Sequence, residues 1–301
     1  MLLKSRYPTM ELKGLISLNA RMNLSEEDSQ HYLYLEKGYQ GELMFDQLTE
    51  KLQCDMYVIN DLCLEHKGTT FQIDSIIIAQ KTIYPFEIKN YQDDYIFEAG
   101  NFRKLNSKNY ITNPLEQLNR SKILLRQVLQ SLRVDLPIEG YVSFVNPEFT
   151  LYNAPVDEPI ILPTQLKNFL KKINDTPSKL NGWHKNFADQ LVAKHINFPC
   201  NKFPGYKFKD LKKGFLCPVG HSFMIMIGGN KLVCQICGFE ESVVSGVLRS
   251  VKEIKLLFPH IKITTNLVYE WSGMVLSKKV IRRILMENYK ANGYGRWLYF
   301  E

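Results

Sequence analysis

The sequence predicts a mixed α/β fold, in which a β-sheet flanked by helices is followed by a small metal-binding module and a helical tail. Three observations carry this prediction. Strand-like runs and helical periods alternate from residue 38 to about residue 195. Closely spaced cysteine and histidine residues gather after residue 213, and basic helical segments fill the remainder.

Length and composition indicate a globular protein of about two domains. The chain has 301 residues, of which 45% are hydrophobic and 23% charged, as in ordinary globular proteins. No uninterrupted apolar run approaches the roughly 20 residues that a membrane span needs. The N-terminal segment lacks the apolar core and cleavage site of a signal peptide. We therefore expect a cytoplasmic protein that does not associate with a membrane.

The elements of the α/β region follow from local signals. Ser25 and the three acidic residues after it mark a helix start, and a break of this helix is expected between Gly38 and Gly41. Asn113 and Pro114 open another helix. The helical segments expected are 26–52, 114–132, 163–173 and 182–195. The strand-like segments, rich in β-branched and aromatic residues, are 56–64, 72–90, 95–99 and 140–146.

The hydrophobic hairpin at residues 72–90 carries three charged side chains, Asp74, Glu87 and Lys89. Such groups are rarely buried unless they are paired. If the hairpin turns at Gln80 and Lys81, Asp74 falls opposite Glu87, and Glu87 and Lys89 point to the same face. The three groups would then converge. A slip of one residue in the register would send one carboxylate to the other face.

A divalent cation explains the presence of these charges. Two carboxylates supply the hard oxygen ligands that magnesium or manganese prefers, and a cation held there acidifies a water molecule and stabilises charge on a phosphoryl group. Lys89 would orient that water or neutralise the phosphate. This is chemistry that cuts a phosphodiester. The structural alternative is a cross-strand ion-pair cluster in which Lys89 only neutralises the acids.

The ordered motifs of this region resemble the nuclease-related domain family, NERD, a branch of the PD-(D/E)xK nuclease superfamily. The resemblance extends from about Gly38 to Gln130 through the motifs GYQGE, QID, EIKN and NPLEQL. It implies a restriction-endonuclease-like mixed sheet, a divalent-metal nuclease and a role in DNA processing.

The resemblance also assigns roles to single residues. It implies that Asp74 and Glu87 bind the metal and that Lys89 is the catalytic lysine. Glu42 matches the acid of the preceding helix, and Gln117 matches the glutamine that follows the core. Without the resemblance, Glu42 would be interpreted as an acid favourable to its helix dipole and Gln117 as a solvated surface residue.

Four residues near position 230 have the spacing of zinc ligands. They are Cys217, His221, Cys234 and Cys237, and Gly228, Gly229 and Asn230 supply a turn between the two pairs. Two close pairs separated by a hairpin-length insert are typical of a tetrahedral structural zinc, as in a zinc ribbon. The alternative is a set of reduced cysteines with an incidental histidine.

The final third is predicted to bind DNA. Residues 202–301 contain 16 Lys and Arg against 7 Asp and Glu, whereas residues 1–201 contain 22 against 24. A basic surface attracts phosphate backbones regardless of sequence. A short helix from Thr265, a turn at Gly273, a second helix opening at Ser277 and a β-wing at 292–300 resemble a winged helix-turn-helix. The residues expected to meet DNA are Lys278, Lys279, Arg282, Arg283 and Arg296. A solvated basic surface and an ordinary helical bundle are the alternatives.

The sequence therefore predicts five parts and one function. The parts are an N-terminal helical extension (1–37), a nuclease-like domain (38–195), a linker (196–213), a zinc-ribbon-like module (214–241) and a basic helix-turn-helix-like domain (242–301). The function expected is a magnesium- or manganese-dependent nuclease that cuts DNA, with zinc as a structural ion. A non-catalytic DNA-binding or scaffold protein with the same fold is the main alternative, and a nuclease acting on RNA is another.

Overall fold

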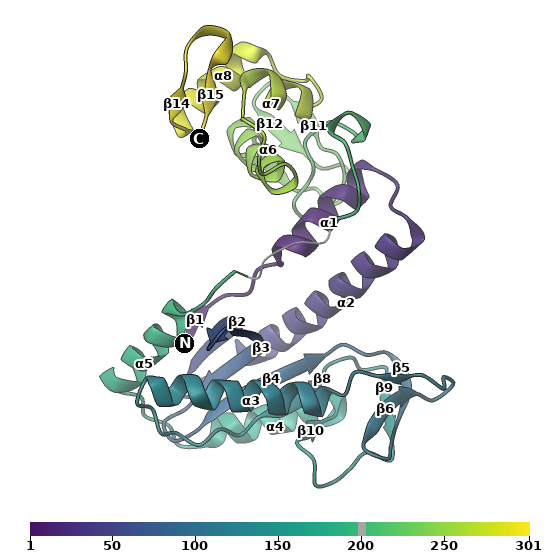
Figure 1. The fold of residues 1–301 in the computed structure, drawn as a ribbon, viewed down its shortest axis with the longest axis vertical. Coiled ribbons are helices and arrows are strands. Elements are labelled where there is room, and N and C mark those ends of the chain that lie inside the picture. Colours follow the sequence, from purple (N-terminus) through teal and green to yellow (C-terminus); the bar gives the residue numbers. More distant parts are fainter. Residues whose placement is uncertain (198–202) are drawn as a thin grey trace. The chain divides into compact units, whose positions relative to one another are not determined.

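The computed structural model describes residues 1–197 and 203–301 of the chain (Figure 1). It divides into two compact units. Unit 1 is formed by Met1–Tyr7 with Tyr34–Phe198, and unit 2 by Pro8–Leu33 with Pro199–Glu301. Each unit therefore combines two segments that are distant in sequence. Part of the predicted linker, residues 198–202, lies outside the described residues.

A six-stranded mixed sheet forms the centre of unit 1, which confirms the predicted α/β class. Strands β2, β3 and β4 pair antiparallel, while the β1–β2, β4–β8 and β8–β10 pairs are parallel. A second sheet has the order β7-β6-β5-β9. The strands are β1 (Leu2–Lys4), β2 (Tyr57–His66), β3 (Thr69–Ile78), β4 (Ile83–Lys89), β5 (Asp93–Glu98), β6 (Asn101–Lys104), β7 (Tyr110–Ile111), β8 (Tyr141–Phe144), β9 (Phe149–Tyr152) and β10 (Ile160–Ile161).

Helices cover both faces of the larger sheet. They are α2 (Glu26–Thr49), α3 (Pro114–Ser131), α4 (Pro163–Asp175) and α5 (Gly182–Ala193). Successive side chains of a strand point to opposite faces. Ile76 accordingly packs in one cluster with residues of α3 and α5, and Ile77 packs in another with residues of α2 and α4. Figure 1 shows α3 lying along the sheet.

Helix α2 is continuous where a break between Gly38 and Gly41 was expected. The two glycines have different surroundings. A Cβ atom at Gly41 would lie 2.3 Å from the Cβ atom of Asn90, whereas a Cβ at Gly38 would meet nothing within 4 Å. Gly41 thus permits a close approach of the α2 backbone to the segment that follows β4, and this approach positions Glu42, the next residue.

Unit 2 combines helices with a small cysteine-rich sheet. Its elements are α1 (Met10–Arg21), η1 (Phe208–Asp210), β11 (Ile225–Ile227), β12 (Lys231–Val233), β13 (Glu240–Ser242), α6 (Val243–Leu257), α7 (Thr265–Trp271), α8 (Lys278–Asn288), β14 (Ala291–Asn292), η2 (Gly295–Trp297) and β15 (Tyr299–Phe300). The predicted helix starts are confirmed, because the side chains of Thr264 and Ser277 cap α7 and α8. In the described parts of the chain, no helix is long and apolar enough to cross a bilayer.

A buried arginine is the polar centre of unit 2. The Arg21 guanidinium makes two hydrogen bonds to Glu253, at 2.9 and 2.7 Å, and donates to the backbone oxygens of Lys212 and Gly214. It also stacks 4.1 Å from the ring centre of Trp271, whose indole N–H binds Glu253. A fully buried cation requires such partners, and these tie α1 to α6 and α7.

Candidate functional site

The β3–β4 hairpin has the register that places the predicted metal ligands together. The strands pair from Ser75↔Phe86 to Ile78↔Ile83, so residues 79–82 form the connection. Extended by one position, this register puts Asp74 opposite Glu87. The prediction of a turn at Gln80 and Lys81 is confirmed.

Asp74 lies where strand β3 loses its regular pairing. The ladder with β2 skips Asp74 and the opposing Asp61, whose φ of 53° lies in the left-handed region. The ladder with β4 ends at Ser75. Beyond this point the backbones of β3 and β4 are no longer paired. Instead, the Asp74 carboxylate accepts a 2.7 Å hydrogen bond from the backbone N–H of Ile88 on β4. The carboxylate is therefore held between the two strands, beside the position of Glu87.

Glu87 and Lys89 lie two positions apart on β4 and form an ion pair. The Lys89 Nζ is 2.7 Å from the Glu87 Oε1, and only 15% and 12% of the two side chains are exposed. Strand β4 is central, because it pairs with β3 on one side and with β8 on the other. A central strand fixes the direction of both side chains.

Glu42 is held by an arginine that sequence reasoning missed. The guanidinium of Arg6, which follows β1, donates a 2.7 Å hydrogen bond to the Glu42 carboxylate. It makes two more to Asp46, one turn further along α2, at 3.0 and 3.2 Å. A fourth bond, of 2.6 Å, reaches the backbone oxygen of Asp74. Arg6 and Asp46 therefore belong to the site, and Arg6 links helix α2 to the end of the β3–β4 pairing.

The carboxyl groups of the site hold protons more tightly than usual. Burial, reinforced by the charge of Asp74, raises the pKa of Glu42 to about 8 and the pKa of Glu87 to about 7. Burial also raises the pKa of Asp74, against the opposing effect of Lys89. The pKa of Lys89 is raised too, because Glu87 and Asp74 outweigh the desolvation of its ammonium. These acids are thus close enough to disfavour full ionisation together.

The charges of the site fit an additional cation. Four acids, Glu42, Asp46, Asp74 and Glu87, lie with the cations Arg6 and Lys89, so full ionisation of the acids would leave an excess of negative charge. A doubly charged ion would offset the remaining negative charge, and carboxylate oxygens are its preferred ligands. Glu42, Asp74 and Glu87 do not all have donor atoms within 4.8 Å of one another. The three carboxylates therefore do not form one ready-made set of ligands.

Gln117 lies in the first turn of α3, whose N-cap is Asn113. The Gln117 Oε1 is buried and has no hydrogen-bond partner among the described residues. A buried amide oxygen without a partner costs free energy, so this atom is suited to a ligand or an ordered water. This observation supports Gln117 where the sequence alone favoured a surface residue.

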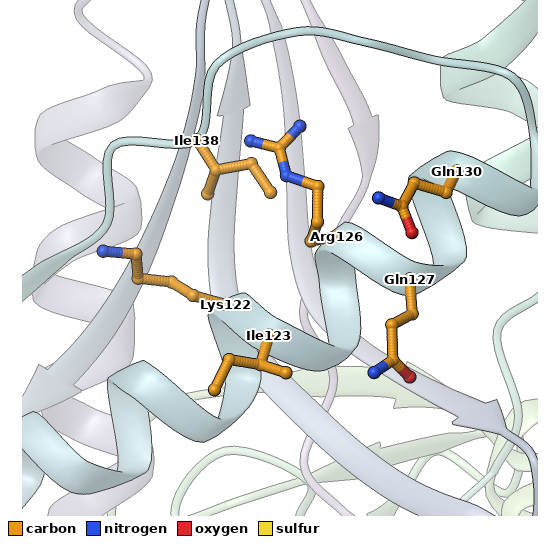
Figure 2. A pocket seen from close by; sticks show the side chains of 6 residues that line it. All are labelled: Lys122, Ile123, Arg126, Gln127, Gln130 and Ile138. Carbon is orange, nitrogen blue, oxygen red and sulfur yellow. The ribbon is translucent and has the colours of Figure 1, made fainter.

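A shallow pocket of about 410 Å³ lies elsewhere, on α3 and the chain after it (Figure 2). Its lining includes Lys122, Arg126 and Ile138. None of the five predicted catalytic residues lines this pocket, so it carries no part of the site.

Three of the four predicted zinc ligands meet in unit 2. Donor atoms of Cys217, Cys234 and Cys237 all lie within 4.8 Å of one another, and the cysteines are free thiols. The backbone N–H of Gly220 donates to the Cys217 Sγ at 3.2 Å. Contact with the Ser222 hydroxyl, at 3.1 Å, lowers the pKa of Cys234 to about 6. Both contacts favour thiolates, which are the forms that bind metals, but burial outweighs the Gly220 contact and raises the pKa of Cys217.

His221 does not join this group of three donors. Its Nδ1 is nevertheless buried and without a hydrogen-bond partner in the described chain. Gly220 beside it lies close against the cysteine group, because a Cβ there would lie 3.1 Å from the Cys237 Sγ. His221, the fourth predicted ligand, therefore follows directly on a residue that contacts the cysteine group. Its Nδ1 has no hydrogen-bond partner in the described chain.

The predicted DNA-binding residues are all exposed. Lys278, Lys279, Arg282 and Arg283 lie on α8, and Arg296 lies in the turn between β14 and β15. The opposite face of α8 is apolar, with Ile281, Ile284 and Leu285 fully buried. The basic side chains are therefore free to meet an external partner.

Comparison with known families gives one result. Residues 37–145 match the model of the nuclease-related domain, NERD, over a little more than a third of the chain. The matched segment contains Glu42, Asp74, Glu87, Lys89 and Gln117. Arg6 and the cysteine group lie outside it. No curated protein and no solved structure matches the chain.

Proposed function

We propose, from the match of residues 37–145 to the nuclease-related domain, that unit 1 is a divalent-metal-dependent deoxyribonuclease of the PD-(D/E)xK type. The observation that carries this proposal is the placement of Asp74, Glu87 and Lys89 where the β3–β4 pairing opens. Acids outnumber cations there, so the site would attract a metal cation. The bound cation would then attract a phosphate group of the substrate.

Each residue has a role in the proposed reaction. Asp74 and Glu87 would hold magnesium or manganese, which supplies an acidified water and neutralises phosphate charge. Lys89 keeps its ammonium charged and can donate to the attacking water or to the phosphate. Glu42, oriented by Arg6, is placed to accept a proton, because its raised pKa lies near neutrality. The Oε1 of Gln117, which has no hydrogen-bond partner in the described chain, would be available to a bound water or ligand.

Unit 2 would deliver the DNA. Its exposed basic residues on α8 suit contacts with phosphates, and the predicted linker, zinc-ribbon-like module and winged-helix-like domain remain our proposed division of this part. Zinc would be held by Cys217, Cys234 and Cys237, with His221 as the proposed fourth ligand. The three free thiols fit a reducing compartment such as the cytoplasm.

Cleavage assays test the enzymatic proposal. Plasmid, linear and single-stranded DNA, and RNA of equal length, are incubated with purified protein and magnesium or manganese. We expect cleavage of DNA that Asp74→Ala and Lys89→Ala abolish while DNA binding is kept. Asp93→Ala and Lys104→Ala, an exposed acid and amine of the same unit, are matched controls that should cleave normally. Binding without cleavage under either metal would support the non-catalytic alternative, and cleavage of RNA alone would change the substrate.

Cobalt substitution tests the proposed zinc site. We expect one zinc per chain, and a cobalt-loaded protein with thiolate-to-metal charge-transfer bands. His221→Asn should alter the visible cobalt spectrum, and the exposed His260→Asn of the same unit should not. An unchanged spectrum in His221→Asn would remove this histidine from the ligand set.

A further inference from the structure

The hairpin β14–β15 displays two aromatic rings to solvent. Tyr294 is 92% exposed and Trp297 is 73% exposed, the highest values for aromatic side chains in the described chain. Both lie in the connection between the strands, within residues 293–298. Exposed rings forgo the favourable free energy of burying apolar surface, so their position requires an explanation.

Hydrogen bonds and a buried side chain anchor the two ends of this connection. Phe300 is 1% exposed within the core of unit 2, and its N–H donates to the Ile263 oxygen at 2.9 Å. Lys290 and Glu301 exchange two backbone hydrogen bonds of 3.0 Å. Gly293 has a φ of 81°, and a Cβ there would lie 2.6 Å from the Trp297 oxygen. The rings are therefore presented by an anchored turn, which reduces the entropy that a partner must remove on binding.

A basic residue lies beside one of the two rings, and basic residues precede the hairpin in the chain. The Arg296 guanidinium lies 5.1 Å from the ring centre of Trp297. Helix α8, with its four exposed basic side chains, leads into the hairpin after only two residues. Aromatic rings next to arginine and lysine, on a part of the chain with nine excess positive charges, match a polyanion that also offers flat apolar faces.

We infer that Tyr294 and Trp297 stack on unpaired bases, so that this hairpin binds single-stranded nucleic acid in preference to duplex. In a duplex the base faces are covered by their neighbours, whereas an unpaired base can lie on an aromatic ring. The inference rests on the proposed DNA-binding role of unit 2. It adds that the nucleic acid bound is single-stranded and not duplex. A nuclease that carried it would be directed to gaps, overhangs or unwound ends.

Tryptophan fluorescence tests this inference directly. The chain has three tryptophans, of which Trp271 is fully buried and Trp183 lies in unit 1. An oligothymidylate is added without magnesium or manganese, so that binding is separated from cleavage. We expect quenching that survives in Trp183→Phe and is lost in Trp297→Phe. A blunt duplex of equal length should quench little.

Affinities provide the second measurement. Tyr294→Ala and Trp297→Ala should each weaken binding of the oligothymidylate roughly tenfold and leave duplex affinity within about twofold. Equal losses for both forms, or no loss, would overturn the inference. Arg282→Ala with Arg283→Ala should weaken both forms, because these side chains meet phosphates. If the arginine variants bind normally, the DNA-binding proposal itself fails, which distinguishes the two failures.

Discussion

Arg6 donates a 2.7 Å hydrogen bond to the carboxylate of Glu42, although 36 positions separate them in the chain. The same guanidinium binds Asp46 and the backbone oxygen of Asp74. The candidate site is thus completed by a residue that precedes the matched family segment. A protein trimmed to residues 37–145 would lack this cation and strand β1.

Removing Arg6 should damage both stability and metal binding. Arg6→Ala leaves Glu42 and Asp46 buried without their counter-charge, and we expect a loss of about 3–5 kcal/mol in the free energy of unfolding. Arg6→Lys keeps the charge but not the planar fork, so its stability should be intermediate. Denaturant unfolding and manganese titration measure the two effects. Wild-type values for Arg6→Ala would exclude Arg6 from the site.

Stability of the protein without magnesium or manganese should fall as the pH rises. Burial raises the pKa of Glu42 from an ordinary value of 4.5 to about 8, so the folded state retains a proton that the unfolded state has released. The free energy of unfolding should therefore decrease between about pH 5 and pH 8. Glu42→Gln should flatten this slope, and Glu98→Gln, which removes an exposed acid, serves as control. The measurement is denaturant unfolding of zinc-loaded protein at several pH values, in a buffer free of magnesium, manganese and unbound zinc. An unaltered slope in Glu42→Gln would contradict the assignment.

Two glycines of one helix should respond in opposite directions to alanine. Gly41→Ala places a methyl group against Asn90 and should destabilise by roughly 1–3 kcal/mol through overpacking. Gly38→Ala meets no neighbour and should stabilise by up to about 1 kcal/mol, because alanine favours helix. Thermal unfolding of both variants decides the matter. Equal shifts would mean that α2 does not approach Asn90 this closely.

The Arg21–Glu253 pair should be essential to unit 2. Glu253→Ala leaves a fully buried guanidinium without its acid and should cost about 3–5 kcal/mol. Glu240→Ala breaks the half-exposed pair with Lys231 in the same unit and should cost less than about 1 kcal/mol. Denaturant unfolding followed by tryptophan fluorescence in a Trp183→Phe background reports on this unit, because the other two tryptophans both belong to it. Similar losses for the two variants would refute the distinction.

The sequence predicted those features that follow from short-range pattern. The hairpin register follows from β-branched residues on both sides of a turn at Gln80 and Lys81, and the pairing agrees. The starts of α7 and α8 were marked by local signals at Thr265 and Ser277. The spacing of the cysteines predicted that Cys217, Cys234 and Cys237 lie close together, and they do.

Features that depend on long-range contacts could not be predicted. Nothing near Arg6 marks it as the partner of Glu42 and Asp46, because its role arises only when β1 joins the sheet. The expected break in α2 was wrong because a helix tolerates glycine where a side chain packs against its backbone, as the Asn90 side chain does at Gly41. The opening of the ladders at Asp74 depends on the backbone of Asp61, which has no distinctive sequence signal.

Each unit combines an N-terminal segment with a segment that is synthesised later. Neither unit can therefore complete its fold until the later segment has been translated. Arg21 leaves the ribosome 232 residues before Glu253, the acid that it binds. Leu18, which is fully buried in the core of unit 2, must therefore remain uncovered while unit 1 is being translated. Helix α1 therefore leaves apolar surface open to chaperones or to aggregation until unit 2 has been synthesised.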